Sequence, residues 1–134
     1  MKEIGELNLP DDVLYSDDHE WARLEGETVK IGISDYAQDR LGDITFVEVP
    51  AVGDTFKQAE EFGNVESTKA VSEMLMPIGG EILAVNETLE DSPELLNQDP
   101  YGEGWIIEVK PDDQAGLGSL MNKEAYVKML EGMD

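Results

Sequence analysis

The residue with the clearest chemical potential is Lys69. It is the only Lys or Arg between Lys57 and Lys110, a stretch that contains twelve Asp or Glu residues. Strand-like apolar runs flank it at 62–67 and 71–76. If these runs pair as a hairpin, Lys69 projects from an exposed turn where a modifying enzyme can reach its amine. From these residues alone, the alternative is an unmodified surface lysine that relieves repulsion among carboxylates.

Other residue types with catalytic or metal-binding chemistry are scarce. The acidic surroundings of Lys69 differ from the apolar pocket that activates a Schiff-base lysine. His19 is the only histidine and the chain has no cysteine, which argues against a His-based triad, a Cys nucleophile, Cys-ligated zinc and disulfides. The acidic pairs 11–12 and 17–18 lack the spacing of an EF-hand. We therefore expect no catalytic residue and no metal site, with a structural or surface role for His19.

The charge of the chain restricts its partners. It has 31 Asp and Glu residues against 9 Lys and Arg residues, a formal net charge of -22. Too few cations are available to neutralise phosphates, so binding to nucleic acid or to an anionic membrane is not expected. Basic protein surfaces should attract the chain. Strong repulsion between copies favours a monomer.

Length and hydrophobicity indicate one globular domain over residues 1–134. The chain is 40% hydrophobic, which is enough for a core. The first residues show neither a secretory nor an organellar targeting pattern, and no apolar run is long enough to span a membrane. We expect a cytoplasmic protein.

The elements that must position Lys69 are mostly short strands. Apolar or alternating runs between turn residues predict strands over 21–24, 29–33, 44–49, 62–67, 71–76, 81–85 and 105–109. Ser34 is a good N-cap for a short helix that ends at Gly42.

Two further helices are expected later in the chain. The segment Ser92-Pro93-Glu94 favours one or two helical turns over 95–96. Asn122 can cap a helix over 123–131, with Met121 and Tyr126 placed as a hydrophobic staple. Residues 112–118 read as a loop. The predicted fold is mainly β, and the C-terminal helix should pack on the outside of the sheets.

The segment around Lys69 resembles a known modification site. Residues 65–72, VESTKAVS, resemble the lipoylation segment of the H protein of the glycine cleavage system. The resemblance extends over about residues 15–130 in the family's order. Further matching segments are YSDDHEW at 15–21, GISDYAQDRLG at 32–42, GDITFVEVP at 42–50 and EDSPELLNQDPYGEGW at 90–105.

This resemblance implies a fold and a role. The fold would be a lipoyl/biotinyl-type barrel-sandwich hybrid with short helices, two sheets packed face to face and a C-terminal helix. Lys69 matches the lysine that bears covalent lipoate, attached by a lipoate ligase or lipoyl transferase. The lipoyl arm would receive an aminomethyl group from glycine decarboxylase and deliver it to aminomethyltransferase. Dihydrolipoyl dehydrogenase would then reoxidise the dithiol. The chain would be a carrier and not an enzyme.

The resemblance also suggests which side chains surround the cofactor. Glu66, Ser67 and Ala70 belong to the matching segment around the lysine. Glu20 and Glu73 match positions near a cleft in which the loaded arm can rest, where a carboxylate could pair with an ammonium group. Two positions depart from the family pattern: Thr68 stands where Val is commoner, and Glu73 stands where Asp is usual.

Two other functions are compatible with the sequence. A lipoyl carrier or relay of the same fold could serve another lipoate-dependent pathway, and a plain acidic interaction module would leave Lys69 unmodified. A biotin carrier is disfavoured because methionines usually flank the biotinyl lysine. A lipoyl domain of a 2-oxoacid dehydrogenase would normally lack the segment at 90–105.

Overall fold

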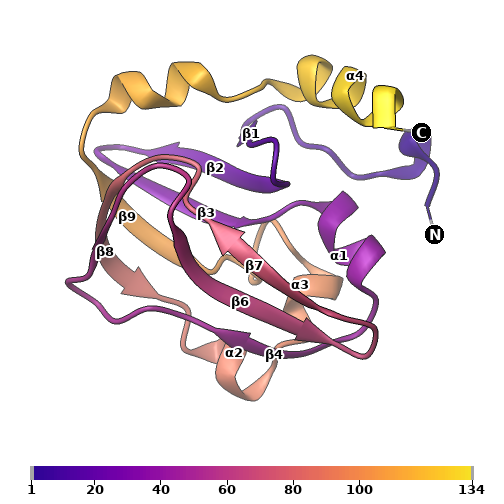
Figure 1. The fold of residues 1–134 in the computed structure, drawn as a ribbon, viewed down its shortest axis with the longest axis horizontal. Coiled ribbons are helices and arrows are strands. Elements are labelled where there is room, and N and C mark those ends of the chain that lie inside the picture. The colour runs from indigo at the N-terminus through magenta and orange to yellow at the C-terminus, as the bar shows by residue number, and fades with distance from the viewer. Residues whose placement is uncertain (1, 134) are drawn as a thin grey trace.

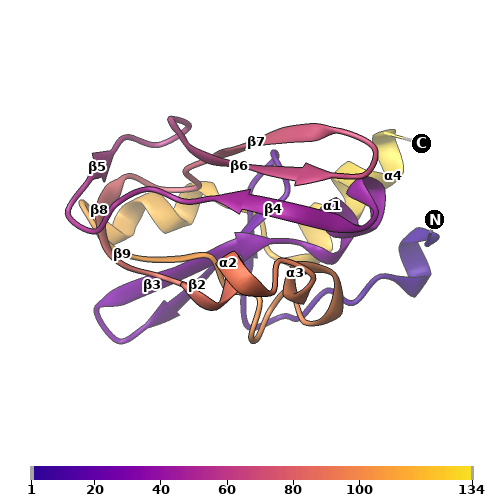
Figure 2. The same ribbon diagram turned by 90° about the horizontal axis from the view of Figure 1, so that it is seen from below.

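Two antiparallel β-sheets packed face to face form the body of the protein (Figure 1). The computed structural model describes residues 2–133, without the side chains of residues 114 and 115. The larger sheet has the strand order β1-β2-β3-β9-β8-β5, and the smaller has the order β4-β6-β7. Figure 2 shows the smaller sheet as a separate layer over strands β2, β3 and β9. This arrangement confirms the expected mainly-β fold with two sheets.

The strands are short, as the alternating sequence pattern predicts. The larger sheet contains β1 (Leu14–Tyr15), β2 (Glu20–Glu25), β3 (Thr28–Ile33), β5 (Thr55–Phe56), β8 (Gly80–Val85) and β9 (Ile107–Pro111). The smaller sheet contains β4 (Ile44–Glu48), β6 (Glu61–Ser67) and β7 (Val71–Leu75).

Apolar side chains from the two inner faces fill the space between the sheets. Val29 and Ile31 of β3 are fully buried, as the period-two pattern requires. They belong to the same apolar cluster as Val65 of β6 and Met74 of β7. The core therefore fixes the smaller sheet, including the hairpin that bears Lys69, against the larger one.

Helix α1 (Asp35–Leu41) leads from the larger sheet into the smaller one. The hydroxyl of Ser34 accepts a hydrogen bond from the backbone N–H of Ala37 at 3.2 Å, which confirms Ser34 as the N-cap. Gly42 follows the helix with φ +78°. The helix ends there, and strand β4 begins two residues later.

Helix α4 (Lys123–Met133) is the predicted C-terminal helix. The side-chain oxygen of Asn122 accepts a hydrogen bond from the backbone N–H of Ala125 at 2.9 Å. The helix packs beside β1, where the ring of Tyr126 stacks on that of Tyr15 with centroids 4.5 Å apart. Met121 joins the same apolar cluster, as expected for the staple.

The region from 86 to 121 differs most from the sequence prediction. Helix α2 (Thr88–Asp91) was not predicted, and Ser92 ends it instead of beginning the next helix. Helix α3 (Leu95–Gln98) confirms the short helix predicted over 95–96, and it starts after Glu94. Strand β9 begins at Ile107, two residues later than predicted.

Two short 3₁₀ helices complete the structure. The helix η1 (Ile4–Glu6) lies near the N-terminus, and η2 (Gln114–Ser119) occupies the segment that was predicted as a loop. None of the described helices has the length and hydrophobicity needed to cross a membrane. Within residues 2–133, apart from the undescribed side chains, no group of three or more His, Asp or Glu residues is placed to hold a metal ion.

Candidate functional site

Lys69 lies in the turn between β6 and β7. The backbone N–H of Ser67 donates to the carbonyl of Ala70 at 2.8 Å and closes the turn. The hydroxyl oxygen of Ser67 accepts hydrogen bonds from the N–H groups of Lys69 and Ala70, each at 3.1 Å. A serine at the start of a turn commonly holds the following N–H groups in this way. Ser67 and Ala70 therefore shape the turn that presents the lysine.

The turn is attached to the body on its other side as well. Strand β6 lies between β4 and β7, so the hairpin is anchored at its base by a third strand. The backbone N–H of Thr68 donates to the carbonyl of Asp43 at 3.1 Å. The aliphatic part of Lys69 lies against Gly42. These contacts hold the backbone of the tip in place and leave its side chains outside.

The lysine amine is accessible. Thr68, Lys69 and Ala70 are all exposed, and among the described residues none forms an ion pair with Lys69. An exposed primary amine on a fixed turn can be acylated by an enzyme that encloses the tip.

Glu66 precedes the turn on β6 and is half-buried. It pairs with Phe46 of β4 on one side and with Val71 of β7 on the other. Its backbone carbonyl accepts a hydrogen bond from the hydroxyl of Thr45 at 3.2 Å. Glu66 thus sits in the middle of the sheet, next to the tip.

Glu20 lies deep beside the edge of the same sheet, with only 2% of its surface exposed. Ser16 donates a hydrogen bond to its carboxyl group at 2.8 Å, and the backbone N–H of Leu75 approaches the second oxygen at 3.5 Å. Burial raises the pKa of this carboxyl to about 8, against the hydrogen bond from Ser16, which lowers it. The nearby charge of Asp18 adds to the rise. Glu20 therefore carries its proton at neutral pH.

Glu73 has a different setting. Its side chain is exposed on β7, across from Asn64 of β6. Within the described part of the chain, no hydrogen bond links Glu73 to Glu20. The structure thus brings Glu66, Ser67 and Ala70 together with Lys69, buries Glu20 at the edge of β7, and leaves Glu73 on the outer face of that strand.

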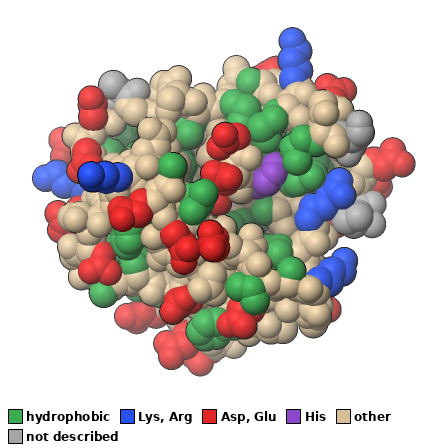
Figure 3. Space-filling model, in the orientation of Figure 1, with side chains coloured by type: hydrophobic (Ala, Val, Ile, Leu, Met, Phe, Trp, Pro, Cys, Tyr) green, Lys and Arg blue, Asp and Glu red, His purple; other side chains and the backbone are tan. Residues whose placement is uncertain are grey.

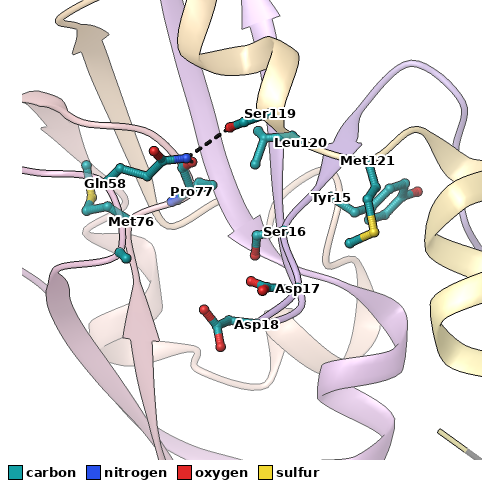
Figure 4. Close-up of a pocket in the computed structure, with 11 residues that line it drawn as sticks. Tyr15, Ser16, Asp17, Asp18, Gln58, Met76, Pro77, Ser119, Leu120 and Met121 are labelled. Atoms are coloured by element: carbon teal, nitrogen blue, oxygen red, sulfur yellow. Dashed lines mark hydrogen bonds between the residues drawn. The ribbon is translucent and has the colours of Figure 1, made fainter. Parts of the chain in front are cut away.

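A cavity of about 470 Å³ opens beyond the far end of β7 (Figure 4). Ser16, the hydrogen-bond partner of Glu20, lines one wall together with Asp17 and Asp18. The opposite walls come from residues around β5, β7 and η2: Gln58, Ala59, Met76, Pro77, Ser119 and Leu120. Its lining was not predicted as a site. The only sequence signal is the acidic pair 17–18, which lacks the spacing of an EF-hand.

The face that carries the cavity is acidic. Figure 3 shows Asp and Glu side chains gathered around the middle of this face, with the single histidine beside them. Burial and the charge of Asp17 raise the pKa of Asp18. A cationic group is favoured here because it lowers the repulsion among these carboxylates.

His19 has a structural position next to this wall. It adopts a left-handed backbone conformation, with φ 72°, in the turn that leads into β2. Its ring nitrogen Nδ1 is 2.8 Å from the hydroxyl of Tyr126, which is also 2.8 Å from the hydroxyl of Ser34. Burial lowers the pKa of His19. The histidine therefore connects helix α4 to the larger sheet, at the turn before β2 and beside Ser34 at the end of β3.

Comparison with known proteins agrees with this geometry. The family model described as glycine cleavage H-protein matches residues 13–133. The glycine cleavage system H protein of Bacteroides thetaiotaomicron is 48% identical over 126 residues, which is 94% of this chain and 100% of the relative. That of Anaeromyxobacter sp. (strain K) is 49% identical over 125 residues, 93% of this chain and 98% of the relative.

A solved structure gives the same result at the level of the fold. The crystal structure of a glycine cleavage system H protein from Mycobacterium marinum superposes with a TM-score of 0.85 at 37% identity. The match covers 92% of this chain and 99% of the other. The fold is therefore the barrel-sandwich fold of lipoyl carriers, as the sequence resemblance implied.

Proposed function

The chain belongs to the glycine cleavage H-protein family, the lipoyl carriers of the glycine cleavage system, and on this basis we propose that Lys69 is its lipoyl attachment site. Proteins of this family are carriers and not enzymes. The observation that carries the proposal is the exposed amine of Lys69 on a turn held by Ser67 and anchored to β4 through Asp43.

The protein's part in this function is presentation. The bound lipoyl group supplies a disulfide that can be opened and reclosed, and such chemistry belongs to the cofactor and the partner enzymes. This chain supplies a fixed base and a flexible lysine stem. Tethering then keeps a high local concentration of the cofactor near each docked partner. Glu66 and Ala70 flank the base of the arm, and Ser67 holds the backbone there.

H proteins work with the other components of the glycine cleavage system. We infer that this chain exchanges its cargo with glycine decarboxylase, aminomethyltransferase and dihydrolipoyl dehydrogenase. We also infer that a lipoate ligase or lipoyl transferase modifies it. The acidic surface supports docking to basic patches on these partners. The cytoplasmic location expected from the sequence stays a prediction.

We further propose that the cargo end of the arm rests against the acidic face beside β7. Strand β7 leads from the tip that bears Lys69 towards the cavity lined by Ser16 and Asp18. A cationic amine bound there would favour ionisation of Glu20, which lies directly behind Ser16. Glu73 lies on the exposed side of β7, so it would contact the middle of the arm and not its cargo end.

Intact mass tests the attachment site. The protein is co-expressed with a lipoate ligase in medium supplied with lipoate, and its mass is compared with that of the unmodified chain. We expect one lipoyl adduct, located by peptide mapping at Lys69. A chain that stays unmodified, or one modified at another lysine, would contradict the proposal.

Glycine-dependent exchange of carbon dioxide tests the pathway. The lipoylated protein is mixed with purified glycine decarboxylase and labelled bicarbonate, with the unmodified protein as the matched control. Label should enter glycine only with the lipoylated form. A lipoylated protein that fails to support exchange would instead point to a carrier of the same fold in another lipoate-dependent pathway.

A further inference from the structure

The outer face of the smaller sheet carries two exposed apolar side chains in one row. Phe46 of β4 is 49% exposed and Val71 of β7 is 64% exposed. Both are paired in register with Glu66 of β6. Residues directly opposite each other on neighbouring strands point to the same face, so these three side chains form one row across the sheet. Single exposed apolar residues are common, but two in one row form a surface that a partner can cover.

This row lies next to the attachment point. Val71 follows Lys69 by two residues, and Glu66 precedes it by three. The turn is tied to the start of β4 by the hydrogen bond from Thr68 to Asp43. A protein that encloses the tip of the hairpin therefore comes next to this row, which we call the Phe46–Val71 row.

The surroundings of the row are acidic. The next row on the same face consists of Glu48, Asn64 and Glu73. Strands β4, β6 and β7 contain no Lys or Arg. Figure 3 shows hydrophobic and acidic side chains next to one another in the lower part of the face, over this sheet. A matching partner surface would place an apolar contact at its centre and basic groups around it.

We propose that the Phe46–Val71 row is the docking surface for the enzyme that acylates Lys69, an inference that rests on the proposed function. The chemistry of acylation requires the enzyme to come close to the turn. The deprotonated Nζ of Lys69 attacks the carbonyl carbon of an activated lipoyl group, an amide C–N bond forms, and the bond from that carbon to its leaving group breaks. The leaving group departs with the electron pair, and the amine's proton passes to the solvent.

This step separates the acylating enzyme from the other partners. It needs the enzyme's reactive carbon at bonding distance from the lysine nitrogen, so the enzyme has to contact the base of the lysine stem. Partners that react with the sulfur end of the arm work a full arm's length from the turn. Aromatic residues are enriched at the centre of protein interfaces, and Phe46 is the exposed aromatic residue of this row.

The test uses the unmodified full-length chain, lipoate, ATP and a purified lipoate ligase. The variants are Phe46→Thr, Val71→Thr and the double variant, because threonine keeps a strand-forming side chain, removes the ring of Phe46 and replaces one methyl group of Val71 by a hydroxyl group. Leu24→Thr is the matched control, since Leu24 is 48% exposed on β2 of the other sheet. Rates at low protein concentration give kcat/KM, and thermal unfolding monitors the fold of each variant.

We expect kcat/KM to fall about tenfold or more in the double variant, mainly through KM, and to change less than about twofold in Leu24→Thr. Val71→Thr is nearly isosteric, so it should fold normally and lose about threefold by itself. In addition, each variant is lipoylated to completion with excess ligase and assayed with dihydrolipoyl dehydrogenase, where all should match the wild type within about twofold.

The outcomes are distinguishable. A wild-type chain that the ligase does not modify would overturn the proposed function and this inference with it. If the ligase modifies the folded variants as fast as the wild type, this inference alone would be overturned. Equal losses with the ligase and with dihydrolipoyl dehydrogenase would also overturn it, because the row would then not be specific to the acylating enzyme.

Discussion

The aliphatic stem of Lys69 lies so close to Gly42 that a Cβ atom on residue 42 would be 3.3 Å from the lysine Cε and 3.5 Å from its Cδ. Gly42 also has φ +78° and ψ -155°, a conformation that is essentially restricted to glycine. The residue after helix α1 therefore has two tasks: it turns the chain into β4, and it leaves room for the lysine stem.

We predict that Gly42→Ala lowers the free energy of unfolding by about 1–3 kcal/mol, because alanine is strained in this conformation. The new methyl group should also displace the lysine stem and slow acylation. Urea unfolding and the rate of lipoylation measure the two effects. Gly5→Ala is the control, since no atom lies within 4 Å of a Cβ placed there. An unchanged unfolding midpoint for Gly42→Ala would contradict this interpretation of Gly42.

Lys69→Arg should fold normally and take no lipoyl group. The side chain is exposed and forms no ion pair with a described residue, so the fold does not depend on it. A guanidinium cannot be acylated in place of the amine. Intact mass and glycine-dependent exchange should both report complete loss, while the unfolding midpoint stays that of the wild type. Lys57→Arg serves as the control, and exchange activity retained by Lys69→Arg would rule out the assignment.

Ser67→Ala should loosen the turn that presents the lysine. The variant loses the acceptor for the N–H groups of Lys69 and Ala70, and each such bond contributes about 0.5–1.5 kcal/mol. Because the turn is exposed, water replaces part of the lost hydrogen bonding, and the loss of stability should lie at the lower end of this range. Hydrogen exchange should show faster exchange at these two amides than in Ser72→Ala, the control on the neighbouring strand. Equal protection in the two variants would show that Ser67 does not hold the turn.

The buried carboxyl of Glu20 should make stability depend on pH. In the unfolded chain this group titrates near 4.5, whereas burial raises its pKa to about 8 in the folded protein. Between these two pKa values the folded state holds a proton on Glu20 that the unfolded state has released. The resulting contribution to the free energy of unfolding is fully present below the lower pKa and is lost as the pH rises to about 8.

Glu20→Gln removes this proton binding and keeps an acceptor for Ser16. We predict that the variant gains stability relative to the wild type as the pH rises from about 5 to about 8, on the order of a few kcal/mol. Urea unfolding at both pH values measures the difference. Glu27→Gln, an exposed control, should follow the wild type at both. A constant difference between Glu20→Gln and the wild type would contradict the burial of a protonated Glu20.

The sequence predicted best where local patterns and local caps decide the structure. The alternation of Val29, Ile31 and Ile33 with residues of the opposite face predicted a strand, and β3 covers these three residues. Ser34 and Asn122 cap helices α1 and α4 through hydrogen bonds to N–H groups three residues later. The hairpin around Lys69 followed from two apolar runs separated by a short link.

The prediction failed where distant groups hold the chain. The amide of Asn86 donates to the carbonyls of Glu103 and Trp105, each at 2.7 Å, and so closes the segment that contains α2 and α3. These bonds leave no periodic pattern in the sequence. One of them goes to the carbonyl of Trp105, a residue that the sequence pattern places in a strand but that precedes β9 in the structure.

Residue types at short spacing are enough to predict the isolated lysine, the alternating strands around it and the family to which the chain belongs. The folded arrangement was needed to show that Glu20 is buried against Ser16 and Leu75, while Glu73 stays outside. It also decided that Phe46 and Val71 lie in one row beside the lysine. Strand register and sheet packing set these relations, and both bring together residues that are far apart in the chain.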